Sequence, residues 1–200
     1  MTRLAIFRPA DTQQRRVPAV NTPWWRRLNV RGASRQSLPE IQHAVLERLL
    51  ALLEAARADV SAGWVQEGWW ATPAHSGQQI LTTGLAAGAS IPGNADAVCL
   101  VGALIRAGRA QGGDSEFGRA IDAVYDAVWE SRGEPVTATG MLTVPAPHVR
   151  QARTQALTRW NDAQGRTSGE VIEVVDLAIA RVIQTLAALP SPHAPEMARA

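Results

Sequence analysis

Hydrophobic positions divide the chain into a front segment with no regular period and a body with helical periods. After the sequence SLPE, apolar residues recur at intervals of three and four over residues 38–60. That pattern predicts a helix with one buried face. Ser37 as N-cap and Glu40 three residues later form a capping box, which places the start of this helix. We expect it to run to about Asp59 and to end near Gly63. Its apolar stripe consists of Leu38, Ile41, Val45, Leu49, Leu52, Leu53, Ala56 and Val60.

The same kind of period predicts four further helices along the body. Thr167 and Glu170 form a second capping box, and Pro190 ends the helix that follows it. Tyr125 and Val128 lie on the inner face of the helix in the middle of the chain. The first of the four covers about 95–107, with Asn94 as its N-cap, and the second begins at Asp114 or Ser115. The third covers about 147–160, and the fourth runs from Thr167 to about Leu189.

The stretch between the first two helices, residues 63–95, is irregular and rich in glycine, proline, serine and threonine. Two short runs in it, Trp69–Thr72 and Gln79–Thr82, can pair as a small β-hairpin across Pro73–Gly77. We therefore expect an all-α or α-rich domain of about five helices with an irregular insert at 63–95.

Charge is distributed unevenly along the chain, although the net charge is only +2. All twenty basic residues are arginine; residues 1–36 hold eight of them and one acidic residue, a net charge of +7. The remaining 164 residues hold twelve arginines and seventeen acidic residues, a net charge of −5. The sequence thus predicts a basic extended arm (1–36), a helical domain (37–189) and a flexible tail (190–200).

Composition indicates a protein of the cytoplasm. No apolar run approaches the roughly 20 residues of a membrane-spanning helix, so we expect no transmembrane segment. The N-terminal residues lack the apolar stretch of a secretory signal. The single cysteine, Cys99, has no partner for an internal disulfide, which favours a reducing compartment.

Candidate chemistry is sparse. The absence of lysine excludes a Schiff base and a phosphate-loop lysine, and one cysteine with four dispersed histidines gives no pattern for a zinc site or other cofactor. Cys99 falls in the first turn of its predicted helix, where we favour a buried, inert thiol. The alternative is a nucleophile, with His75 as its base and Asn161 or Asp162 orienting that base.

Three short motifs stand in order in the body: Gly63-Trp64, the sequence CLVGA that starts at Cys99, and Trp160-Asn161-Asp162. In this order they resemble a family of small bacterial and phage domains of unknown function. The resemblance covers roughly residues 40–188. It implies a shared helical fold and a shared pocket near the three motifs, but no reaction.

The basic arm suggests three kinds of partner, namely a protein groove, a nucleic acid and a membrane surface, although Pro18 and Pro23 interrupt the amphipathic helix that a membrane surface prefers. Tryptophan and arginine are frequent at protein–protein hot spots, so we favour a non-catalytic interaction protein that docks to a protein partner or to a sister subunit. A small cysteine-dependent hydrolase or transferase is the first alternative. A nucleic-acid-binding protein is the second, because arginine attracts phosphate and tryptophan stacks on bases. The predicted partner-binding residues are Arg15, Arg16, Trp24, Trp25, Arg26, Arg27 and Arg31.

Overall fold

The computed structural model describes residues 37–74, 76, 78–84, 91–111, 114–134 and 142–190. The chain divides into two units, Met1–Arg35 and Gln36–Ala200, and every described residue belongs to the second. The predicted arm, His75 and the tail beyond Pro190 lie outside the described residues.

Within the described residues the fold is α-rich, with five helices and a small three-stranded sheet, as the sequence predicted. The elements in chain order are α1 (Leu38–Ala62), β1 (Trp70–Pro73), β2 (Gln79–Thr82), β3 (Ala97–Val98), α2 (Leu100–Ala110), α3 (Asp114–Ser131), α4 (Pro147–Asn161) and α5 (Ser168–Ala188).

Capping boxes fix the starts of the two longest helices. The Glu40 carboxylate accepts from the Ser37 N–H at 2.6 Å, and the Ser37 hydroxyl accepts from the Glu40 N–H at 3.4 Å. The equivalent pair before α5 has distances of 2.8 and 3.3 Å between Thr167 and Glu170. Both predicted boxes are confirmed. Their bonds satisfy backbone amide groups that the helix itself leaves unpaired.

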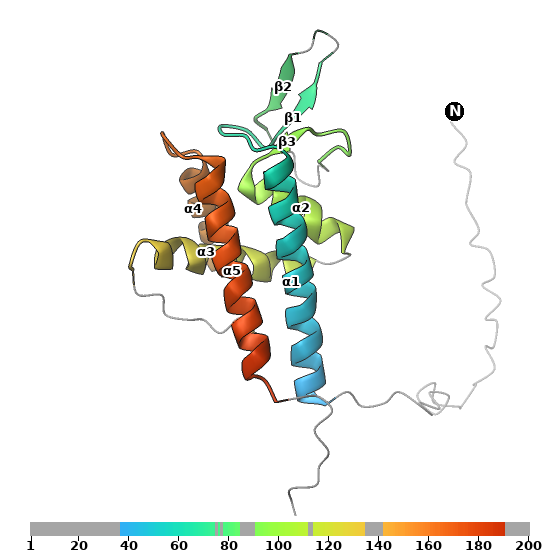
Figure 1. Ribbon diagram of the computed structural model, residues 1–200, viewed down its shortest axis with the longest axis vertical. Coiled ribbons are helices and arrows are strands. Elements are labelled where there is room, and N and C mark those ends of the chain that lie inside the picture. The colour runs from blue at the N-terminus through green and yellow to red at the C-terminus, as the bar shows by residue number, and fades with distance from the viewer. Residues whose placement is uncertain are drawn as a thin grey trace, which may run out of the picture. The chain divides into compact units, whose positions relative to one another are not determined.

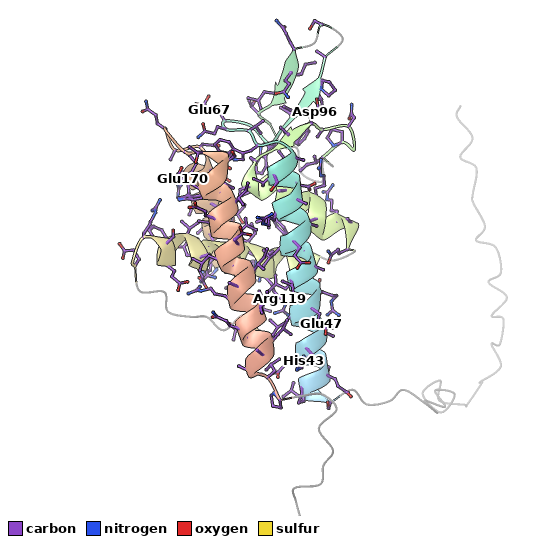
Figure 2. All side chains as sticks on the ribbon, viewed as in Figure 1. His43, Glu47, Glu67, Asp96, Arg119 and Glu170 are labelled. Carbon is purple, nitrogen blue, oxygen red and sulfur yellow. The ribbon has the colours of Figure 1, made fainter. Side chains whose placement is uncertain are left out.

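Helices α1 and α5 lie side by side and run in opposite directions, and α3 crosses them and contacts all four other helices (Figure 1). Side chains along the α1 stripe are fully buried from Leu46 to Val60. The first two positions of the predicted stripe are exposed, Leu38 at 68% and Ile41 at 44%. Val45 is only half-buried, whereas Leu46, which was not predicted, is buried. The exposure of Leu38 and Ile41 follows from the end of α5, the helix that packs against α1, at Ala188. His43 Nε2, near the start of α1 (Figure 2), lies 3.2 Å from the carbonyl of Pro190, which is two residues beyond the end of α5.

The sheet extends the bundle beyond the C-terminal end of α1 (Figure 1). Its strand order is β2-β1-β3 and both pairings are antiparallel. The predicted hairpin is confirmed, with Trp70 opposite Thr82. The third strand was not predicted, and the placement of Ala97 and Val98 in a helix is wrong. They pair with β1 instead, so α2 begins at Leu100.

Candidate functional site

Cys99, the candidate nucleophile, is the N-cap of α2 rather than a residue of its first turn, and it replaces the predicted Asn94 in that role. Its Sγ accepts a hydrogen bond from the Gly102 N–H at 3.2 Å. The residue is only 3% exposed, and burial raises the pKa of the thiol to about 11. The thiol is therefore protonated at neutral pH, and a protonated thiol is a poor nucleophile.

Asn161, at the end of α4, connects the three sequence motifs. Only 1% of it is exposed. Its Oδ1 accepts from the indole N–H of Trp64 at 2.8 Å and from the N–H of Leu100 at 3.1 Å. Its Nδ2 donates to the carbonyl of Val65 at 3.2 Å and to Asp162 Oδ1 at 2.8 Å. One amide side chain thus holds together the loop after α1, the start of α2 and the turn after α4.

Asp162 holds the same loop from its outer side. Its Oδ1 accepts from the N–H of Glu67 at 3.0 Å. Glu67 has φ of 59°, in the left-handed region that non-glycine residues seldom adopt. The neighbouring Gln66 donates through Nε2 to the carbonyls of Asn161 and Ala163, at 3.1 and 3.0 Å. These bonds hold the strained loop in place against the turn.

We call Trp64, Cys99, Asn161 and Asp162 the motif joint. The structure brings these four residues to one place. The polar atoms of Asn161 are taken up by internal hydrogen bonds. The negative charge of Asp162 adds to the rise of the Cys99 pKa and so opposes a thiolate. The arrangement of these residues is that of a packed structural connection.

The other predicted site residues lie outside the described part of the chain. They are His75 and the arm residues Arg15, Arg16, Trp24, Trp25, Arg26, Arg27 and Arg31. Within the described ranges, no three histidine, cysteine or acidic side chains come together as a metal site would require. The described helices also include none with the length and apolar character needed to cross a bilayer.

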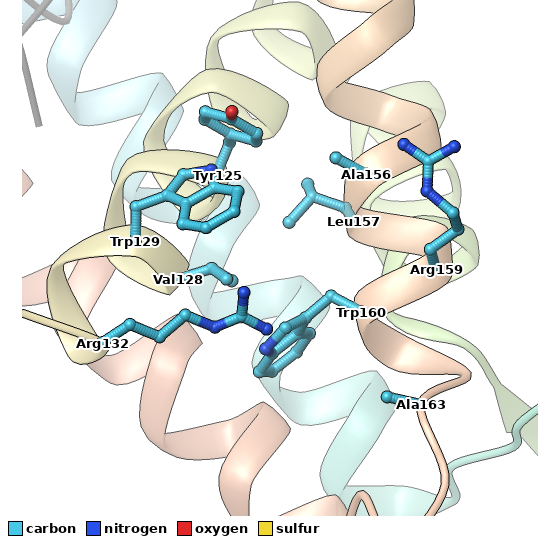
Figure 3. A pocket seen from close by; sticks show the side chains of 9 residues that line it. All are labelled: Tyr125, Val128, Trp129, Arg132, Ala156, Leu157, Arg159, Trp160 and Ala163. Atoms are coloured by element: carbon cyan, nitrogen blue, oxygen red, sulfur yellow. The ribbon is translucent and has the colours of Figure 1, made fainter. Parts of the chain in front are cut away.

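A pocket of about 260 Å³ lies between α3 and α4, beside the motif joint. Two facing stripes with helical spacing line it (Figure 3). The α3 stripe is bulky and the α4 stripe is small at both ends, and this difference leaves the space open. The stripes are Tyr125, Val128 and Trp129 on α3 with Arg132 directly after its end, and Ala156, Arg159, Trp160 and Ala163 on α4 and the turn after it, with Leu157 beside them.

Salt bridges join the two walls of the pocket at one end. Asp122 on α3 accepts from both Arg150 and Arg153 on α4, at 3.0 and 2.8 Å. At the other end, the Arg166 guanidinium lies 4.1 Å from the centre of the Trp160 ring. The salt bridges therefore connect α3 to α4 at one end of the pocket, and Arg166 packs on the Trp160 ring at the other.

Arginine gives the pocket a positive rim. The Arg132 guanidinium lies 4.9 Å from the Trp129 ring centre and extends toward Trp160 (Figure 3). No carboxylate of the described residues forms a salt bridge with Arg132 or Arg159. A second, more polar hollow of about 410 Å³ shares Arg132 and Trp160 with the first and includes Glu173. Of the residues that line this pocket on α3, Tyr125 and Val128 were predicted from the sequence, as part of the inner face of the helix.

The geometry defines an α-rich domain whose three motifs form an internal joint beside an open aromatic pocket. Residues 44–181 match the family DUF6197, a family of unknown function. Because the match covers more than half of the chain, the protein belongs to this family. No curated protein and no solved structure matches the chain.

Proposed function

We propose that the protein is a non-catalytic interaction protein whose basic arm docks to a protein partner or to a sister subunit. The observation that carries this proposal is the burial of Cys99 and Asn161 within the motif joint. A thiol enzyme needs a thiolate within reach of its substrate. Here burial raises the thiol pKa to about 11, and the residue is 3% exposed.

The composition of the arm supports docking. Its net charge of +7 contrasts with −5 for the rest of the chain, so it suits an acidic partner surface. Trp24-Trp25-Arg26-Arg27 places two anchoring aromatics beside two arginines, the residue types that most often dominate binding energy. The helical domain then acts as the rigid body that carries the arm.

Two finer assignments accompany this proposal. We place the protein in the cytoplasm, because its single cysteine suits a reducing compartment. We also infer that the family is one of small bacterial and phage domains characterised by the Gly-Trp, Cys-x-x-Gly-Ala and Trp-Asn-Asp motifs, because these motifs lie within the matched residues 44–181.

The test is affinity capture from native extract with the full chain and two double variants. Trp24→Ala/Trp25→Ala should lose the captured partner, because both anchors are removed without a change of charge. Ile6→Ala/Phe7→Ala is the matched control and should keep it. Thermal unfolding should shift little, since surface changes usually cost within about 0.5 kcal/mol. Equal capture by the wild type and both variants would overturn the proposal.

A further inference from the structure

We propose that the pocket between α3 and α4 is a second docking site, for a short acidic segment of a partner protein that presents one aromatic side chain. The residues that line this pocket belong to the helical domain, and the proposal does not rest on the arm. The proposal rests on the volume of the pocket, the identity of its walls and the charge on its rim.

The volume indicates a single side chain. Pockets that hold whole cofactors or drug-sized ligands span about 300–1,000 Å³, and this one measures about 260 Å³. Tyr125, Trp129 and Trp160 present ring surfaces to it (Figure 3). Aromatic rings pack favourably edge-to-face or offset against one another, so a planar ring is the group that these walls fit best.

The rim requires a negative charge beside that ring. Arg132 and Arg159 line the pocket without a salt bridge from any described carboxylate. The α3 carboxylates of Asp122 and Glu130 are already paired, with Arg150 and Arg153 and with Arg181. A guanidinium binds a carboxylate through paired hydrogen bonds, so acidic residues next to the aromatic one complete the match.

Charge also argues against the chain's own tryptophans as the occupant. Trp24 and Trp25 are followed by Arg26 and Arg27 in a segment of net charge +7. Seating them here would bring like charges to the rim arginines, which is unfavourable. The occupant is therefore a segment of opposite charge from another protein.

The experiment titrates the full-length protein with an acetylated and amidated heptapeptide, Gly-Asp-Glu-Phe-Glu-Asp-Gly, by calorimetry and by the fluorescence of its tryptophans. One control peptide carries alanine in place of phenylalanine, and the other carries lysine in place of all four acidic residues. We expect the first peptide to bind and to change the tryptophan fluorescence, and both controls to bind at least about tenfold more weakly, because each lacks one half of the match.

Protein variants locate the binding. Arg132→Gln should weaken the heptapeptide about tenfold, the cost of losing a hydrogen bond to a charged group. Ala156→Leu should fill the pocket and weaken it at least as much, with an unchanged circular dichroism spectrum as the control for folding. Arg48→Gln removes the same charge from an arginine on α1 that does not line the pocket, and should bind like the wild type.

Several outcomes would overturn the proposal. They are an absence of binding at millimolar peptide, equal binding of the alanine peptide, and unchanged affinity in Arg132→Gln. If Ala156→Leu fails to fold, the comparison of the phenylalanine and alanine peptides on the unmodified protein decides. A shift to dimers that Ala156→Leu prevents would show a second copy as the occupant, and would also refute it. Trp24→Ala/Trp25→Ala should bind the heptapeptide like the wild type. The failure of the arm proposal can therefore be distinguished from the failure of the pocket proposal.

Discussion

Replacing Asn161 tests whether the motif joint holds the domain together. Asn161→Ala removes four hydrogen bonds that connect three segments far apart in the sequence. It leaves the N–H of Leu100, the indole N–H of Trp64 and the carbonyl of Val65 without their partner. The unpaired N–H of Leu100 has the largest free-energy cost of the three, because Leu100 is fully buried and water cannot replace the lost acceptor.

The expected magnitude follows from these contacts. A buried polar group left without a partner costs about 1–3 kcal/mol. Trp64 and Val65 are half-buried and regain part of their bonding from water. We therefore expect Asn161→Ala to lower the free energy of unfolding by about 3–5 kcal/mol. That is a large share of the roughly 5–15 kcal/mol of a typical domain.

Urea unfolding followed by circular dichroism measures this change. With a slope of about 1–3 kcal/mol per molar, the midpoint should fall by roughly 1–5 M. Asn161→Leu restores apolar volume but no hydrogen bonds, so it should be no more stable than the alanine variant. Gln164→Ala, exposed in the same turn, should unfold like the wild type. A loss below about 1 kcal/mol, or rescue by leucine, would show that hydrogen bonding is not what the joint contributes.

Three further predictions follow from buried groups and close contacts. Burial raises the Cys99 pKa to about 11, so iodoacetamide at neutral pH should label only the urea-unfolded chain, as seen by mass spectrometry. The thiol of the unfolded chain loses its proton near a pH of about 8.5. The free energy of unfolding should therefore fall as the pH rises from about 8.5 to about 11, and Cys99→Ser should abolish that fall. Burial also raises the pKa of Asp126. Asp126→Asn should therefore be the more stable form at neutral pH in thermal unfolding, and the difference should close as the pH falls to about 4, near the unfolded pKa. Finally, a Cβ on Gly102 would lie 2.7 Å from the carbonyl oxygen of Trp69, so Gly102→Ala should lower the free energy of unfolding by about 1–3 kcal/mol, measured in urea. Gly169→Ala should not, because its Cβ would meet only Thr167 Oγ1, at an ordinary contact distance of 3.8 Å.

Local signals in the sequence predicted the helices well. The capping boxes at Ser37 and Thr167 place the starts of α1 and α5, because cap and partner are three residues apart and need no tertiary contact. Pro190 similarly marks the end of α5. The end of α1 was placed at about Asp59, and the structure extends the helix to Ala62. Short-range chemistry was sufficient for these elements.

Non-local contacts explain what the sequence did not predict. Ala97 and Val98 form a strand because β1 offers them partners, and Asp96 and Cys99 donate their N–H groups to Ala71 and Trp69 on the same side. Cysteine is also an uncommon N-cap, so Asn94 looked the better choice. Asparagine directly after a helix is typical of a turn former that bonds its own backbone, whereas three of the four partners of Asn161 lie about 60 or more positions away.

The pocket depended on two helices that face each other, a relation that one helical period cannot give. The spacing of Tyr125 and Val128 predicted one face of α3, and Trp160 lies at the end of the predicted helix 147–160. The small residues Ala156 and Ala163 carried no signal of their own. They matter only because α3 places bulky side chains opposite them (Figure 3).

The family match separates the two proposed binding surfaces. Residues 44–181 contain the motif joint and the α3–α4 pocket, whereas the arm, 1–36, lies outside the match. We therefore expect the two surfaces to act independently in this protein. Trp24→Ala/Trp25→Ala should lose the captured partner and keep the heptapeptide, and Arg132→Gln should do the reverse. The two readouts are compared on the same preparations. If each variant loses both ligands, the chain has one continuous binding surface, and the assignment of separate partners to arm and pocket is wrong.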